Sequence, residues 1–427
     1  MRKMKLIVGL LVILSMALAP TAFAAKREKF GVDKRHEEVK KELRTIKPSD
    51  QEFKWKMVMP WSKGLLFYDV AQHFADSVKL ASGGRLDIKL FSAGELVGAM
   101  ESFDAVSKGQ ADIGHDWPGY WKGKNEAFVA FASVPFGLDA EGYNIWLYEK
   151  GGLEMMQDLY GQFNLFALPG GQCGQEMGLF SNKKATKMAD FKGMRVRTPG
   201  WYMDIMNSLG ASVSPLPGGE VYLALERGVI DAAEFSSPAI NYPMGFDEIT
   251  KYVIQPGVHQ PGIQCALFFN KEAYDALPEH YKYILDIAAK ETQAWSYNWI
   301  NALNAEAIRR FKEKVEIVKM YKEAIIEFRK TTKAYIDDLN YNGEIVADYY
   351  DLGPVYNRMG INFLPVDNQG ENVKQSLSDL FNAGLLGGLL AVIVLYLFLR
   401  QLSTTLIVIA AVPFSLLITL GALYFAG

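Results

Sequence analysis

Two parts of the chain alternate strand-like and helix-like segments, and this alternation restricts the available folds more than any other feature. The first part contains, in order, strand 53–61, helix 66–82, strand 85–91, helix 95–109 and strand 111–115. The second part, between residues 194 and 235, repeats this order with shorter segments. Because consecutive strands joined by helices run parallel, each part predicts a mostly parallel α/β sheet covered by helices.

Two similar segments lie beside the second part. "GLFSNKKATKM" at 178–188 and "ALFFNKEAYDAL" at 266–277 are each an apolar strand followed by Asn-Lys and the start of a helix. Such segments, far apart in sequence, are what two crossings between lobes would look like. Residues 272–340 then form an almost continuous helical pattern. These features predict two lobes with bracing C-terminal helices: lobe 1 from residues 51–177 and part of 266–345, and lobe 2 from residues 178–265.

The N-terminus has the three parts of a secretory signal peptide. Residues 1–5 are basic, residues 6–19 are apolar, and residues 22–24 have the small-x-small pattern of a cleavage site. We therefore expect residues 1–25 to be removed and the mature chain to lie outside the cytoplasm. Residues 26–50 carry many charges of both signs, which is typical of a solvated helix or linker without chemistry of its own.

Composition and motifs argue against several classes of function. The 427 residues are half hydrophobic, carry a net charge of −3 and contain no basic block, which argues against a nucleic-acid partner. The sequence has no nucleophile elbow, HExxH motif or acid–base pair at motif spacing that would indicate an enzyme. Cys173 and Cys265 could form one disulfide. Proteins that rely on disulfides for stability contain more cysteines, so two buried free thiols are favoured.

The C-terminus consists of two uncharged apolar runs, 383–399 and 405–427, separated by a short segment that contains Arg400. As a helix, the first run is close in length to the hydrocarbon core of a bilayer. The two runs therefore predict a transmembrane helical hairpin, and a pair of buried core helices is the alternative.

Long motifs between residues 53 and 345 occur in a characteristic order. They are "GELVGAMESFDAVSKGQADIGH", "VPFGLDAEGYNIWLY", "GMRVRTPGWY", "LPGGEVYLALERGVIDAAEF" and "PGVHQPG", followed by "FFNKEAYDALP". Together they resemble the periplasmic solute-binding subunit of TRAP-type (tripartite ATP-independent periplasmic) transporters, in the branch that binds 2-oxo acids and related carboxylates. The resemblance implies a two-lobed α/β periplasmic binding protein, type II-like, that closes on a small organic acid. It also implies that the bound acid is delivered to a membrane permease without catalysis. A homodimer is compatible with the resemblance.

The C-terminal runs resemble a different family. "GGLLAVIVLYLFLRQLSTTLIVIAAVPFSLL" is similar to the second and third membrane helices of resistance-nodulation-division efflux pumps, and residues 366–427 form this fragment. Residues 383–427 contain no acidic residue, so the fragment cannot run a proton-coupled cycle by itself. A genuine hairpin would anchor the periplasmic protein to the inner membrane. The alternatives are a membrane-tethered ligand-binding sensor and a chimeric or truncated efflux-pump product.

Arg197 is the first candidate for ligand binding. It is the last residue of the predicted strand 194–197, directly before the Thr-Pro-Gly turn at 198–200. In open α/β sheets, ligands bind at the carboxyl ends of strands, and the guanidinium fork matches a carboxylate in two places. The family resemblance implies that the arginine of this motif holds the substrate carboxylate. A surface salt bridge is the alternative for Arg197.

Glu234 ends the predicted strand 229–235 and should lie near the same cleft. A carboxylate there would repel an anionic ligand unless a cation or proton lies between them. The resemblance implies a cation, Na⁺ or Ca²⁺, held by a glutamate and the substrate; an ion pair with a lysine or arginine is the alternative. Glu176 and Gln175, in the glycine-rich loop 170–178, occupy the region where relatives supply a further polar ligand.

Aromatic residues complete the predicted site. Trp201 opens the helix after the turn and is expected to wall the site and, with Glu234 and Glu176, to hold the cation; packing in the core is the alternative. Tyr120, with its neighbours Trp117 and Trp121, predicts either a flap over the ligand or a cap on one lobe.

Two histidines and one phenylalanine are predicted to have less direct roles. His115 and His259 lack the spacing of metal ligands and are expected to be structural. Phe235 stands where related proteins commonly have tryptophan, which leaves the identity of the solute open.

Overall fold

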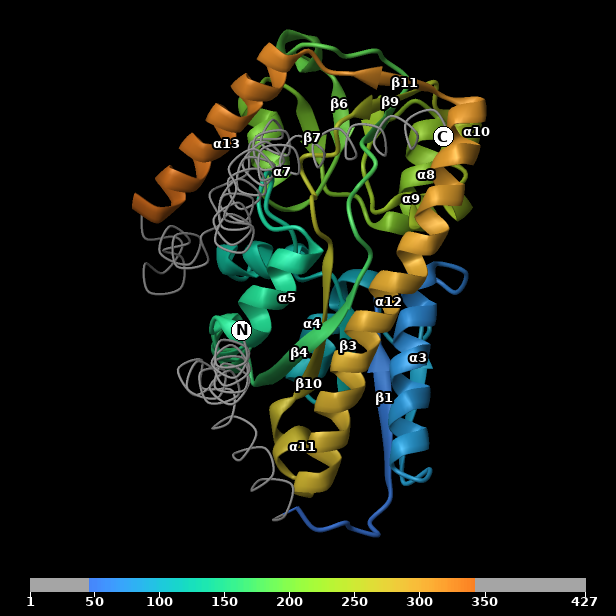
Figure 1. The fold of residues 1–427 in the computed structure, drawn as a ribbon, viewed down its shortest axis with the longest axis vertical. Coiled ribbons are helices and arrows are strands. Elements are labelled where there is room, and N and C mark those ends of the chain that lie inside the picture. The colour runs from blue at the N-terminus through green and yellow to red at the C-terminus, as the bar shows by residue number, and fades with distance from the viewer. Residues whose placement is uncertain (1–45, 342–427) are drawn as a thin grey trace, which may run out of the picture. The chain divides into compact units, whose positions relative to one another are not determined.

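The computed structural model of the chain describes residues 46–341. The predicted signal peptide and the predicted membrane hairpin lie outside these residues, as does most of the charged segment 26–50. Within the described part, none of the helices is both long and apolar enough to cross a membrane. Two β-sheets, one above the other in Figure 1, form the framework and confirm the prediction of a two-lobed α/β protein.

The sheet of the first lobe has five strands in the order β2-β1-β3-β10-β4. Their bounds are Phe53–Val58 (β1), Leu86–Phe91 (β2), Ile113–Asp116 (β3), Leu165–Gln172 (β4) and Gln264–Asn270 (β10). β1 pairs in parallel with β2 and β3, whereas β10 runs antiparallel to β3 and β4. In β1, Lys54 and Lys56 are exposed while Trp55 and Met57 are buried, which is the two-residue period of a strand with one solvated face.

Several helices of the first lobe surround this sheet. Their bounds are Leu66–Ala81 (α3), Ser102–Ser107 (α4), Ala140–Glu149 (α5), Gly152–Gly161 (α6) and Lys271–Asp275 (α11). In α3, Phe67, Val70, Phe74 and Val78 are buried at the three- and four-residue spacing of one helical face. This face contacts β2 and the long helix that follows α11, so α3 is fixed beside the sheet (Figure 1).

The sheet of the second lobe has six strands in the order β11-β9-β5-β8-β6-β7. Their bounds are Leu179–Ser181 (β5), Arg195–Arg197 (β6), Ser212–Ser214 (β7), Ala232–Ala233 (β8), Tyr252–Gln255 (β9) and Glu316–Lys319 (β11). The helices are Gly200–Ser208 (α7), Gly218–Glu226 (α8), Pro238–Asn241 (α9) and Phe246–Ile249 (α10). Both sheets are mixed rather than mostly parallel, because the strands that flank the crossings, β4 with β10 and β5 with β9, pair antiparallel.

Two segments cross between the lobes. Residues 173–178 lead from β4 to β5, and residues 256–263 lead from β9 to β10. They run side by side, and the main-chain N–H of Glu176 donates to the main-chain oxygen of Gln260 at 3.0 Å. Gly178 has a φ of +149°, and a Cβ there would lie 2.3 Å from a main-chain oxygen of β9. Glycine is therefore required where the crossing approaches β9 this closely.

The long helix α12, Glu279–Lys314, braces both lobes (Figure 1). Its Asn304 side chain donates to the main-chain oxygen of Cys173 in one crossing at 3.2 Å and accepts from the N–H of Ala239 in α9 at 2.8 Å. Cys173 and Cys265 are both buried free thiols.

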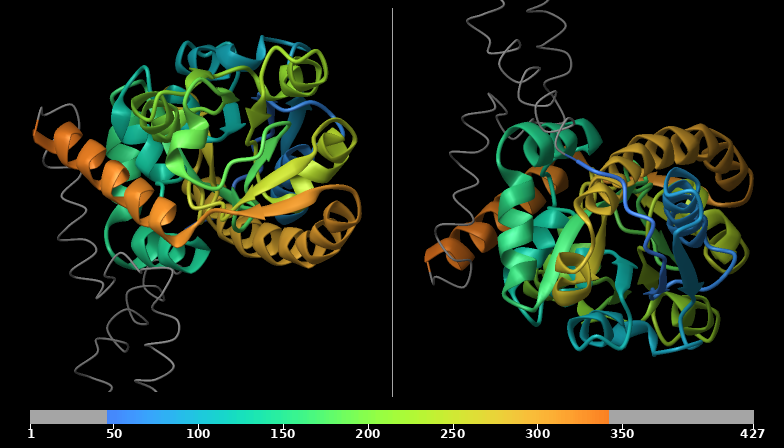
Figure 2. Two further views of the ribbon diagram at one scale, coloured as in Figure 1. Left: turned by 90° about the horizontal axis from the view of Figure 1, so that it is seen from above. Right: turned by 90° about the horizontal axis from the view of Figure 1, so that it is seen from below.

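The predicted helical pattern after the crossings is interrupted. β11 follows α12 and pairs in parallel with β9, which returns the chain to the second sheet. The last described helix, α13 (Lys322–Tyr341), then extends away from α12, as Figure 2 shows. Its Phe328 ring packs against Phe136 at 5.3 Å and against Tyr202 of α7 at 5.5 Å. Helical periodicity alone did not reveal this strand because it has only four residues.

Candidate carboxylate and cation site

Arg197 is the last residue of β6, as the sequence predicts. Thr198 and Pro199 follow, and Gly200 begins α7 with a φ of +68°. A Cβ at Gly200 would lie 3.1 Å from the ring of Trp117 in the first lobe. Glycine thus provides both the left-handed conformation and the close approach of the two lobes beside Arg197.

The guanidinium of Arg197 is almost completely buried, with 1% of the residue exposed. Its Nε donates to the main-chain oxygen of Leu216 at 2.9 Å, and Nη1 donates to the main-chain oxygen of Glu234 at 2.7 Å. Nη1 also lies 3.3 Å from the Glu234 carboxylate, and the guanidinium lies 5.5 Å from the ring centre of Phe235. Main-chain oxygens therefore hold the group in place, while its charge is only weakly paired and suits an anionic ligand.

Three cavities meet at Tyr120. The innermost, about 10 Å³, is lined by Trp61, Phe67, Trp117, Tyr120, Arg197, Pro199, Phe235, Gln260 and Ile263. Two outer cavities of about 260 and 180 Å³ share Tyr120, Met100 and Pro217. The innermost cavity has room for roughly one water molecule, so a larger ligand reaches Arg197 only if the lobes open.

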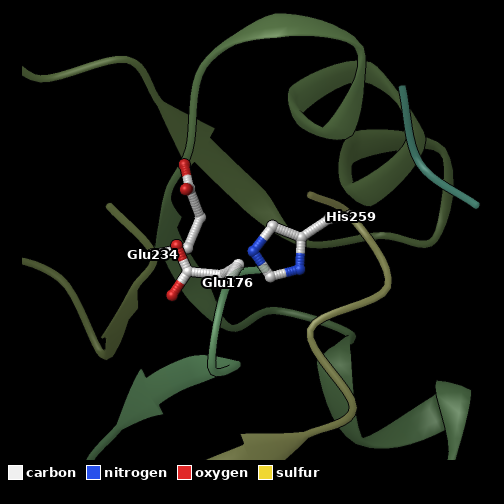
Figure 3. Close-up of side chains that lie close together, drawn as sticks. All are labelled: Glu176, Glu234 and His259. Atoms are coloured by element: carbon white, nitrogen blue, oxygen red, sulfur yellow. The ribbon is translucent and has the colours of Figure 1, made fainter. Parts of the chain in front are cut away.

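Next to Arg197, Glu234 forms a buried cluster with Glu176 and His259. Each residue offers one ligand atom, and these atoms lie within 4.8 Å of one another; Figure 3 shows a ring nitrogen of His259 facing the carboxylates. Asn241 donates to Oε1 of Glu176 at 3.0 Å, and Gln260 donates to Oε2 of Glu234 at 2.6 Å. Among the described residues, Oε2 of Glu176 and Nε2 of His259 find no hydrogen-bond partner. Most buried polar atoms in proteins have a partner, so these two atoms can accept one, whether an ion, a ligand or a water molecule.

Burial governs the charges of this cluster. It raises the pKa of Glu176, and the negative charge of Glu234 raises that pKa further. It also raises the pKa of Glu234, although the guanidinium of Arg197 opposes the shift. Burial lowers the pKa of His259 to about 3, so its imidazole is neutral near pH 7. Two buried carboxylates this close need a proton or a cation between them.

The structure separates the predicted site residues into two groups. Arg197, Glu234, Glu176 and Tyr120 come together, whereas Gln175 is exposed. Glu176 is buried and faces the cluster, while the role of Gln175 as a ligand stays a prediction.

Trp201 is fully buried, but its side chain offers no ligand to a cation. An indole N–H is a donor only, and here it donates to Glu126 at 2.8 Å. The Trp201 side chain therefore links α7 to the first lobe, and the part of this residue in the cation site stays a prediction.

The residues of the aromatic loop divide between the innermost cavity and the interior of the first lobe. Trp117 and Tyr120 line the innermost cavity and pack together at 5.3 Å. Trp121 instead donates to Asp116 at 2.8 Å and packs on Phe103, within the first lobe.

Three residues beside the site were not among its predicted members. Trp61 and Gln260 line the innermost cavity, and His259, which is predicted to be structural, lies in the buried cluster with the two glutamates. The signal that could have found His259 and Gln260 is their position in the segment "PGVHQPG", which forms one of the two crossings.

Polar contacts also close the mouth of the cleft. Lys122 of the first lobe pairs with Asp204 of α7, and it lies 3.4 Å from Glu126. The Tyr335 hydroxyl of α13 donates to the same Asp204 carboxylate at 2.9 Å. Together with the bond from Trp201 to Glu126, these contacts hold the lobes in the closed arrangement.

Comparison with protein families gives two matches. Residues 57–342 match the bacterial extracellular solute-binding proteins of family 7, and residues 358–427 match the AcrB/AcrD/AcrF family. The second match confirms the resemblance of the C-terminus to efflux pumps, and it lies outside the described residues.

Individual relatives agree with the first match. A monocarboxylate 2-oxoacid-binding periplasmic protein of Nostoc sp. is 38% identical over 257 residues, which span 60% of this chain and 71% of the relative. A TRAP periplasmic solute-binding protein of Pseudoalteromonas atlantica, with bound sodium and pyruvate, has a TM-score of 0.68 and 31% identity. The similar region spans 70% of this chain and 92% of that structure.

Two further solved structures are similar. The counterpart from Colwellia psychrerythraea holds calcium and pyruvate, with a TM-score of 0.67, 31% identity, and coverage of 70% of this chain and 92% of that one. A mixed-occupancy dimer from Bordetella bronchiseptica, with calcium and picolinate at one site, has a TM-score of 0.70 and 26% identity, covering 79% of this chain and 99% of that one. The chain therefore belongs to family 7 of the bacterial extracellular solute-binding proteins, the non-enzymatic periplasmic binding proteins of TRAP transporters.

Proposed function

We propose that this protein captures a small 2-oxo acid or related monocarboxylate in the periplasm and delivers it to a TRAP permease. The observation that carries the proposal is the buried, weakly paired Arg197 beside the innermost cavity. The relatives that bind pyruvate or 2-oxo acids support the choice of ligand. Aromatic walls formed by Trp61, Phe67 and Phe235 suit a ligand with a short apolar end.

A cation completes the proposed site. Glu234 and Glu176 supply carboxylate oxygens, which suit Na⁺ and Ca²⁺, and the unpartnered Oε2 of Glu176 fits such an ion. The ion would offset the repulsion between Glu234 and the ligand carboxylate, while Arg197 orients that carboxylate. Glu176 and Glu234 are thus positioned to hold the ion and Arg197 to hold the acid.

A thermal-shift screen of 2-oxo, 2-hydroxy and dicarboxylic acids, each with and without Na⁺ or Ca²⁺, tests the proposal. Ligands stabilise the state that they bind, so a small 2-oxo acid such as pyruvate should raise the melting temperature most. Calorimetry of the best acid should then show one site and no turnover. Failure of every acid with every cation would contradict the proposal.

We further propose that residues 383–427 form a membrane hairpin that tethers the binding protein to the inner membrane. Their two uncharged runs and the family match over 358–427 support this. A periplasmic binding domain places the first run with its start outside, so Arg400 would lie in a cytoplasmic turn, in agreement with the positive-inside rule. The native protein should then remain in the membrane pellet after a carbonate wash, and recovery in the soluble fraction would contradict the tether.

A homodimer is the remaining proposal about partners. The relative from Bordetella bronchiseptica is a dimer. Light scattering of the purified protein, with and without pyruvate, measures the oligomeric state of this chain.

A further inference from the structure

We infer that His259 makes this cation site selective for a borderline divalent ion, such as Zn²⁺, over Na⁺ and Ca²⁺. The inference rests on the proposed function, since it concerns the ion that would bind beside the captured acid. It assigns His259 a role that the sequence did not predict.

The geometry of the buried cluster carries this inference. One atom from each of Glu176, Glu234 and His259 lies within 4.8 Å of the other two, which is a separation that a single metal ion can span. The three side chains come from different segments: one crossing, the end of β8 and the other crossing. Figure 3 shows them converging from these separate parts of the backbone.

Two buried atoms of the cluster have no hydrogen-bond partner within the protein and are available to an ion. Within residues 46–341, neither Nε2 of His259 nor Oε2 of Glu176 has a hydrogen-bond partner, and both residues are at least 97% buried. The imidazole cannot turn freely, because it stacks on the Tyr202 ring at 4.4 Å with an angle of 11° between the planes. An ion placed among these atoms would complete the coordination of both.

The donor set then determines which ion binds best. Na⁺ and Ca²⁺ prefer sites made of oxygen atoms, whereas an imidazole nitrogen favours borderline divalent ions. A 2-oxo acid adds two oxygens in chelating positions, its carboxylate and its 2-oxo group, beside the nitrogen and the two carboxylates. The site would therefore capture the acid together with the ion, and Tyr202 would keep the imidazole aimed at it.

The test uses the purified full-length protein after treatment with a chelator and dialysis. Zn²⁺, Mn²⁺, Ca²⁺ and Na⁺ are each titrated alone by competition with a metal indicator, and pyruvate is then titrated by calorimetry with each ion. We expect Zn²⁺ to bind the protein at least about tenfold more tightly than Ca²⁺, and to raise pyruvate affinity more. His259→Gln, which replaces the nitrogen with an amide oxygen, should abolish this preference while pyruvate binding with Ca²⁺ persists.

A matched control separates the buried site from surface binding. His73 pairs with Glu291 at 2.7 Å in a more exposed position and could itself bind Zn²⁺, so His73→Gln should leave the preference intact. Pyruvate binding that is equally strong with Ca²⁺, Na⁺ and Zn²⁺ would overturn the inference and leave the proposed function standing. Failure of pyruvate and the other acids with all four ions would overturn both. Loss of the preference in His73→Gln, with no change in His259→Gln, would overturn the inference alone.

Discussion

Two arginine–carboxylate pairs lie at opposite ends of β6, and they are built differently. Arg195 donates from Nε and Nη2 to the two carboxylate oxygens of Asp231 at 3.1 and 2.7 Å, and its main-chain N–H donates to the same carboxylate. Arg197 makes one contact of 3.3 Å with the Glu234 carboxylate and gives two further bonds to main-chain oxygens.

The two pairs also differ in exposure. The Arg195 side chain is 47% exposed, whereas the Arg197 side chain is 1% exposed and its partner Glu234 is fully buried. A bidentate pair at the surface satisfies the hydrogen-bonding groups of both partners. It therefore stabilises the lobe without a further ligand. A buried, loosely paired guanidinium is costly unless an anion completes it. Two arginines separated by one residue thus have different surroundings, which suit Arg195 to a structural role and Arg197 to the proposed ligand binding.

Replacing Arg197 should have the largest effect. Arg197→Lys keeps the positive charge but removes the two-pronged guanidinium that can hold a carboxylate at two points. The loss of this charge-assisted pair in the closed cleft should cost about 2–5 kcal/mol, which lowers pyruvate affinity by tens- to thousands-fold. Calorimetry measures this loss, and Arg195→Lys is the matched control, expected to bind pyruvate like the unmodified protein. Wild-type affinity in Arg197→Lys would show that the carboxylate binds elsewhere.

Glu234→Gln should have the next largest effect on binding. The amide removes the charge that attracts the cation, so pyruvate affinity should fall roughly tenfold and lose its dependence on added Na⁺ or Ca²⁺. Calorimetry at several ion concentrations measures both changes. Glu220→Gln removes the same charge from the lining of an outer cavity and should keep the ion dependence. Persistence of that dependence in Glu234→Gln would exclude this residue as a cation ligand.

The surface pair should instead affect stability and its pH dependence. The hydrogen bonds from Arg195 hold the pKa of Asp231 well below its ordinary value. The folded protein therefore favours the ionised form, and the stabilisation is present above about pH 4 and is lost as the pH falls through the lowered pKa. Asp231→Asn should lower the free energy of unfolding by about 1 kcal/mol, because Arg195 is half exposed.

Denaturant unfolding at pH 7 and at pH 3 measures this effect. The difference between Asp231→Asn and the unmodified protein should be full at pH 7 and smaller at pH 3, while pyruvate affinity at pH 7 stays unchanged. A large loss of pyruvate affinity in this variant would remove the distinction between the two pairs.

The contacts at the mouth of the cleft should have the smallest effect. Asp204→Asn removes a partner of Lys122 and thereby lowers the population of the closed form. A partly exposed pair contributes about 0.2–1 kcal/mol, so pyruvate affinity should fall by no more than about fivefold. Asp337→Asn breaks the exposed pair with Lys333 within α13 and should leave the affinity unchanged. Equal effects of the two variants would show that Asp204 does not stabilise closure.

Much of the fold could be predicted because its signals are local. The alternation in β1, the apolar stripe of α3 and the turn after Arg197 each depend on residues close in sequence, and the structure contains all three. The mixed direction of the sheets could not be predicted this way, since it depends on which strands pair across the crossings. β11 was missed because a strand of four residues has too few positions to show a period.

The sequence by itself determined the two-lobed α/β architecture, the position of Arg197 at the end of a strand and the family resemblance. These follow from periodicity, turn chemistry and motif order, which are properties of neighbouring residues. Only the tertiary structure decided that Glu176 faces inward while Gln175 faces solvent, that the indole of Trp201 binds Glu126, and that His259 joins the glutamates. The reason is physical: this site forms where two crossings and a strand end converge, and sequence spacing does not encode the distances between segments that meet only on folding.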